Sequence, residues 1–118
     1  MNNKTCAAAV HAVDDTAVIE LTGEVDGGAA AVLNAAYQQA IADGAAQTVV
    51  LDFARVDYIN STGIALIVSV LAQARAQRRT VVASGLSEHY REIFDITRLS
   101  DFIEVFGDLD AALQTHSH

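Results

Sequence analysis

The chain has 118 residues, of which fifteen are acidic and seven basic, so its formal net charge at pH 7 is −8. Because binding to nucleic acid needs a dense basic surface, this balance excludes nucleic acid as an expected partner. The length fits one domain, and a single cysteine, Cys6, excludes a disulfide scaffold.

An alternating strand opens the predicted fold. Over residues 17–22, Ile19 and Leu21 lie on one face and Val18 lies on the other, which is the period of a half-buried strand. A further strand over residues 7–13 would pair antiparallel with it and make the sheet mixed.

A helix and a buried strand are expected next. The glycine-rich residues 23–28 break the first strand, and Asp26 is placed to cap a helix over about residues 28–43. Residues 48–53 are continuously apolar up to Asp52, which predicts an interior strand covered on both faces.

A second helix is expected after the polar residues 60–63 and continues to Arg75 or beyond. Its apolar stripe consists of four residues at helical spacing, which are Ile64, Ile67, Val68 and Leu71. Arg75, Arg78 and Arg79 fall at the end of this helix, where their charge complements its negative pole.

The last third of the chain repeats the alternation of strands and helices. Residues 80–83 predict a strand, Ser87 caps a short helix, residues 102–106 form a last strand or extended segment, and Asp108 caps a final helix. Elements in this order predict an α/β fold with a largely parallel sheet.

Sequence signatures of catalysis and of cofactor binding are missing. The glycine spacing over residues 23–28 does not match a dinucleotide-binding loop, and the four histidines lack the spacing of metal ligands. We therefore expect no enzymatic activity, no metal and no cofactor. A small-molecule or nucleotide site at the 23–28 turn stays open as the weakest alternative.

Two adjacent hydroxyls, on Ser61 and Thr62, mark the junction before the second helix. The positive pole of a helix favours an anion there, and phosphorylation would add about −1.5 to −2 charges at this point. The alternative is that Ser61 and Thr62 only cap the helix.

Five segments, spread over most of the chain, have a recognisable combination of motifs. They are LTGEVD (residues 21–26), VVLDFARV (49–56), YINSTGI (58–64), SEHYREIF (87–94) and ITRL (96–99). Together these segments resemble the STAS domain, the family of bacterial anti-sigma factor antagonists and their relatives. The resemblance extends over about residues 17–113, within one expected domain over residues 1–118 whose core spans about 7–113 between short flexible termini.

The resemblance implies a mixed sheet of four to five strands with about four helices, and a binding module without activity of its own. Its members bind an anti-sigma factor serine/threonine kinase, release a sigma factor and are switched off by phosphorylation in an Asp-Ser-[Ser/Thr]-Gly motif. By position the acceptor here is Thr62, with Ser61 as second choice, and Asn60 replaces the usual Asp.

The expected partner-binding surface surrounds this motif. It comprises Asp26, Asn60, Ser61, Thr62, Gly63 and Ile64. An unmodified scaffold or subunit of a larger regulatory or transport assembly is the alternative function. The free cysteine, the lack of a leader and the lack of a membrane-spanning run predict a cytoplasmic protein, and the sequence leaves the oligomeric state open.

Overall fold

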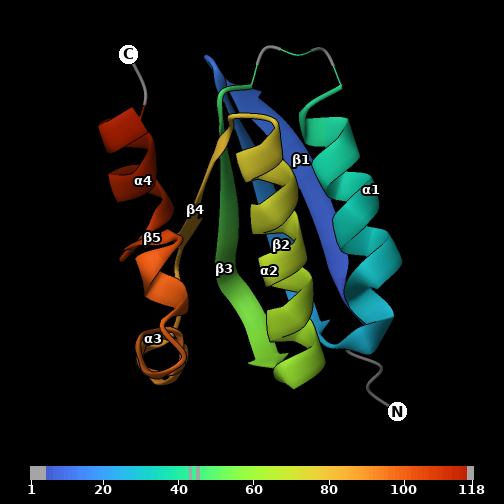
Figure 1. The fold of residues 1–118 in the computed structure, drawn as a ribbon, viewed down its shortest axis with the longest axis vertical. Coiled ribbons are helices and arrows are strands. Elements are labelled where there is room, and N and C mark those ends of the chain that lie inside the picture. Colours follow the sequence, from blue (N-terminus) through green and yellow to red (C-terminus); the bar gives the residue numbers. More distant parts are fainter. Residues whose placement is uncertain (1–4, 43, 45, 117–118) are drawn as a thin grey trace.

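A five-stranded mixed sheet organises the chain, and the computed structural model describes residues 5–42, 44 and 46–116. The strands are β1 (Ala7–Val13), β2 (Thr16–Val25), β3 (Thr48–Ile59), β4 (Thr80–Ser84) and β5 (Glu104–Phe106). They lie side by side in chain order, with β1 antiparallel to β2 and the other neighbours parallel (Figure 1). The predicted mixed sheet and the antiparallel first strand are thus confirmed.

Four α-helices and two 3-10 turns accompany the strands in the described part of the chain. They are η1 (Gly27–Ala29), α1 (Ala30–Ala40), α2 (Ser61–Ala76), α3 (Glu88–Ile96), η2 (Leu99–Asp101) and α4 (Leu109–His116). Buried residues of α1, α2 and α3 pack in one core against the sheet, whereas α4 packs in a separate, smaller core (Figure 1). The predicted α/β class with about four helices is confirmed.

The two cores follow from the two-residue period of the central strands. Val18, Val50 and Val82 stand opposite one another on β2, β3 and β4, and all three are fully buried beneath α4. Their neighbours along the chain point to the larger core instead, as Ile19 and Leu51 do. The apolar run of β3 is therefore explained by burial on both faces, as expected.

The glycine-rich segment does not end β2 where the sequence predicted. Gly23 adopts a left-handed φ of 87°, and the register of β2 against β3 shifts there, but the strand continues to Val25. A glycine in this conformation is typical of a bulge. Because β3 also runs beyond its expected end, Val25 and Ile59 pair as the last residues of both strands.

Other boundaries also differ from the prediction. Asp26 caps the 3-10 turn η1 instead of α1, and α1 ends at Ala40. The last strand starts only at Glu104, because Phe102 closes the η2 turn and is 66% exposed. Residue 43, the expected end of α1, lies outside the described part, as do residues 1–4 and 117–118 of the termini that were expected to flank a core of about 7–113.

The expected apolar stripe of α2 is wrong in part. The residues that α2 buries are Gly63, Ile67, Val70 and Ala74. Val68 is 46% exposed, and Ile64 and Leu71 are only half-buried. The small residues Gly63 and Ala74 allow α2 to approach the strands closely, and hydrophobic side chains alone did not mark this face.

Candidate functional site

The predicted site lies at the carboxyl ends of β2 and β3. Val25 and Ile59 pair in parallel register, so the segments that follow them leave the sheet at the same edge. The Asn60 N–H donates to the Val25 carbonyl over 3.2 Å and joins these two segments directly. Carboxyl ends of parallel strands are where open α/β sheets place their binding sites.

Asn60 is the N-cap of α2. Its backbone is extended, and its side-chain Oδ1 accepts a hydrogen bond from the Gly63 N–H over 2.8 Å. The cap therefore does not depend on the hydroxyls of Ser61 and Thr62, which argues against the interpretation that they only cap the helix. Asparagine in place of aspartate keeps the capping oxygen and removes one negative charge.

Both hydroxyl-bearing residues of the junction, Ser61 and Thr62, are exposed. Within the described part of the chain, neither hydroxyl makes a hydrogen bond. The first turn of α2 also contains no acidic residue, so no side-chain charge there offsets the positive pole of this 16-residue helix. The two hydroxyls are thus accessible from solvent, and they lie at a position that favours an anion.

Gly63 allows the start of α2 to lie against the end of β2. A Cβ added at Gly63 would lie 2.8 Å from the carbonyl carbon of Val25 and 3.2 Å from Cγ2 of Ile59. Such distances exclude any larger residue unless the backbone moves. The helix start, including Thr62, is therefore held firmly against the two strand ends.

The η1 turn lies beside Thr62. A Cβ added at Gly27 would be 3.5 Å from Cγ2 of Thr62, which is ordinary contact. The Asp26 carboxylate accepts from the Gly28 N–H over 2.9 Å and shapes this turn. With Ile64 following on α2, the structure brings all six predicted partner-binding residues to one edge of the sheet.

A hollow of about 450 Å³ beside the junction contains residues that sequence reasoning did not select. It is lined by Thr5, Cys6, Glu24, Asp26, Gly27, Gly28 and Asn60. Thr5 and Cys6 reach it because β1 runs antiparallel to β2 and pairs Ala7 with Thr22. The predicted antiparallel strand was the available signal for their position.

Cys6 lines this hollow as a passive thiol. It is buried, and burial raises its pKa, with the negative charge of Asp26 raising it further. The thiol stays protonated at neutral pH, so the nucleophilic thiolate is scarce.

No group of three or more His, Cys, Asp or Glu side chains within residues 5–42, 44 and 46–116 is arranged to hold a metal ion. None of the helices in that same part is long and apolar enough to cross a membrane.

The chain is similar to known proteins over most of its length. The family model described as "Mlab, STAS domain" matches residues 8–114. BtrV from Bordetella bronchiseptica, which its name places provisionally among the anti-sigma factor antagonists, is 33% identical over 100 residues. This alignment covers 85% of this chain and 85% of BtrV.

Two solved structures show the same fold. The phosphorylated form of the Bacillus cell-fate determinant SpoIIAA has a TM-score of 0.71 at 24% identity, over 92% of this chain and 98% of SpoIIAA. An anti-sigma factor antagonist from Mycobacterium paratuberculosis has a TM-score of 0.78 at 23% identity, over 97% of this chain and 96% of that one.

Proposed function

The chain belongs to the STAS domain family, in its anti-sigma factor antagonist type, and from this premise we propose that it captures an anti-sigma kinase. Capture releases the sigma factor that the kinase holds. Phosphorylation of Thr62 by the same kinase ends the interaction. The proposed protein is a binding module without catalysis, and its proposed location is the cytoplasm.

The observation that carries this proposal is the exposed hydroxyl of Thr62 at the start of α2, which has no hydrogen-bond partner among residues 5–42, 44 and 46–116. A kinase must reach the acceptor oxygen, and here no described side chain or helix cap competes for it. Ser61 is exposed as well and is the second acceptor. Asn60 performs the capping, so modification of either hydroxyl leaves the cap in place.

Electrostatics explain how one phosphate acts as a switch. A phosphothreonine at the N-terminal end of α2 is compatible with the helix dipole, so the fold survives the modification. At a docked interface, the new dianion meets acidic groups or dry contacts at a cost of about 1 to 4 kcal/mol per close charge pair. That cost corresponds to a roughly fivefold to several-hundredfold loss of affinity.

The proposed interface comprises Asp26, Asn60, Ser61, Thr62, Gly63 and Ile64. Opposite Thr62 the partner's contact must be acidic or dry for the switch to work. Around that contact, basic groups on the partner suit the net charge of −8, because opposite charges accelerate encounter and make binding sensitive to salt.

Incubation with the cognate kinase and ATP, followed by intact-mass measurement, tests the proposal. One added phosphate is expected on the parent chain, none on Thr62→Ala, and one on Ser61→Ala. Phosphate on Thr62→Ala but not on Ser61→Ala would move the acceptor to Ser61.

The alternative is an unmodified scaffold or assembly subunit, and the observation that favours it is Asn60 in place of the motif's aspartate. Under this alternative the same surface packs permanently against its partner. Absence of phosphate from every variant, with an intact complex, would support the scaffold and contradict the switch.

A further inference from the structure

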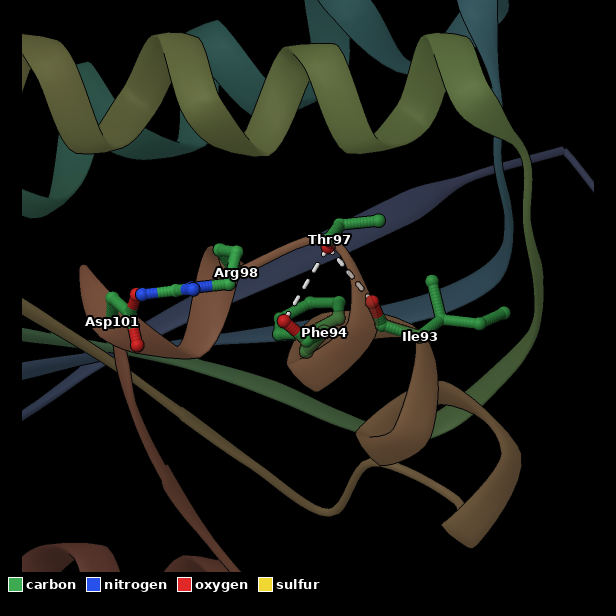
Figure 2. A network of polar contacts seen from close by, with 5 residues as sticks. All are labelled: Ile93, Phe94, Thr97, Arg98 and Asp101. Atoms are coloured by element: carbon green, nitrogen blue, oxygen red, sulfur yellow. Dashed lines mark hydrogen bonds and ion pairs between the residues drawn. The ribbon is translucent and has the colours of Figure 1, made fainter.

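A groove of about 710 Å³ runs between α2 and the turn that follows α3. Ile64, Val68 and Leu71 line it from α2, and Leu99 and Phe102 line it from η2 and its end. Figure 2 shows the turn that carries Thr97, Arg98 and Asp101, with α2 passing above it. A space of this size and lining is typical of small-molecule sites.

The apolar wall of the groove is the part of α2 that the fold leaves uncovered. Val68 and Phe102 are 46% and 66% exposed, and Ile64 and Leu71 are half-buried. Ile64, Val68 and Leu71 are three of the four residues of the predicted apolar stripe, of which only Ile67 is fully buried. Apolar side chains gathered on one surface are a feature of binding sites.

Positive charge gathers at the same groove. Four of the seven lysines and arginines of the chain line it, and they are Arg75, Arg78, Arg79 and Arg98. Arg98 follows the end of α3, which is distant in sequence from the other three, so two helix ends bring their arginines to one groove. On a chain with a net charge of −8, this is a local reversal of sign.

Of the four arginines, Arg79 and Arg98 are occupied by contacts within the chain, whereas Arg75 and Arg78 have their charge available for a ligand. Arg79 donates through Nε to the Ala46 carbonyl over 2.9 Å, and Arg98 pairs with Asp101 over 2.8 Å (Figure 2). By contrast, neither Arg75 nor Arg78 forms a side-chain hydrogen bond or ion pair with any of the described residues. A guanidinium without a partner is suited to a carboxylate or phosphate.

Two of the four arginines lie just after helix ends, at positions where glycine is the usual residue. Arg78 and Arg98 have left-handed φ values of 60° and 65°, just after α2 and α3. Glycine is the favoured residue at such helix ends. Both positions instead carry a long cationic side chain that lines the groove.

We propose that this groove binds a small amphipathic anion, with a carboxylate or phosphate head and an unbranched apolar chain. The head pairs with Arg75 and Arg78. The chain lies along Leu71, Val68 and Ile64 and covers Phe102. From residue 64 to 75 the helix rises about 16 Å, which matches a medium-length alkyl chain. This site goes beyond the proposed kinase switch and does not depend on it.

The test is a titration of the ¹⁵N-labelled full chain with decanoate, with decyl phosphate and with the neutral analogue 1-decanol, followed by amide shifts. We expect saturable shifts confined to residues 64–81 and 97–102, and at least tenfold tighter binding of one of the anions than of decanol. A preference between decanoate and decyl phosphate identifies the head group. Equal binding of anion and alcohol, or shifts scattered over the surface, would overturn the proposal.

Variants separate the two parts of the site. The double substitution Arg75→Gln with Arg78→Gln should lower anion affinity at least tenfold and leave decanol unaffected, whereas Val68→Ser should weaken both. The matched control is Arg55→Gln with Arg91→Gln, which removes the same charge from two exposed residues outside the groove. An equal loss of anion affinity in that control would show that the effect comes from net charge alone, and it would contradict the proposed site.

Two further outcomes distinguish this site from the proposed switch. Thr62→Glu should bind the anion as the parent does, so failure of kinase binding leaves the groove result intact. If the groove amides shift with the purified kinase and with neither anion, the groove is a protein-docking surface and the small-molecule proposal is wrong.

Discussion

Gly63 at the start of α2 lies directly against the backbone carbonyl of Val25 at the end of β2. A Cβ added there would be 2.8 Å from the Val25 carbonyl carbon and closer still to its oxygen. The same oxygen accepts the Asn60 N–H over 3.2 Å. The position of the exposed Thr62 hydroxyl therefore depends on a backbone contact that only glycine permits.

Gly63→Ala should destabilise the fold by about 1 to 3 kcal/mol, because the added methyl group must displace backbone. Urea unfolding measures the effect. Gly27→Ala is the matched control, since its Cβ would be 3.5 Å from Thr62 and needs no movement. Equal stability of Gly63→Ala and the parent would show that the helix start is not held as described.

Tyr90→Phe should cost about 1 to 3 kcal/mol of stability, because it leaves a buried N–H without an acceptor. The Tyr90 hydroxyl accepts from the Ile59 N–H over 2.9 Å and ties α3 to the end of β3. Thermal or urea unfolding checks the loss. Tyr58→Phe, at a side chain 48% exposed, should change little, and a comparable loss there would contradict the explanation.

Asn60→Ala should lower stability by about 0.5 to 2 kcal/mol through loss of the helix cap. Asn60→Asp should keep the cap and raise the free energy of unfolding by about 0.3 to 1 kcal/mol at pH 7, since a negative charge is stabilising at a helix N-terminus. Melting curves of the two variants against the parent are the measurement. A destabilised Asp variant would mean that this end of α2 is not electrostatically positive.

Thr62→Glu should weaken kinase binding roughly fivefold to several-hundredfold, by placing charge where docking needs none. Thr62→Ala should bind as the parent does, as measured by calorimetry with the purified kinase. Gln114→Glu adds the same charge at an exposed position on α4 and serves as the control. Equal affinities of the Glu and Ala variants at position 62 would refute the switch.

Alkaline pH should destabilise the chain through Cys6. Its pKa is raised in the folded state from the ordinary value of 9.0 by burial and by Asp26, so the unfolded chain loses this proton first. The stability that the protonated Cys6 thiol contributes to the folded state is complete below pH 9, and it disappears as pH rises through the folded-state pKa. Urea midpoints at pH 7 and pH 10 should differ less for Cys6→Ala than for the parent. An identical pH dependence in both would assign the loss to other groups, such as Tyr37, whose pKa is also raised.

Local patterns in the sequence were sufficient for most elements of the fold. The alternation of Val18, Ile19 and Leu21 predicted a strand with two different faces, and those faces proved to belong to two different cores. Ser87 accepts the Tyr90 N–H, as its predicted role in capping α3 requires. Such features are readable because a strand period or a helix cap involves only residues a few positions apart.

Only the tertiary structure decided which side of α2 is buried and which residues meet at its two ends. Gly27 lies beside Thr62, and Arg98 lines the same groove as Arg75, although these segments are far apart in the chain. The sequence by itself determined the order of the strands and helices, the cap at Ser87 and the position of the junction motif. Their mutual placement depends on sheet register and on close backbone approach at residues such as Gly63, which leave no periodic trace in the sequence.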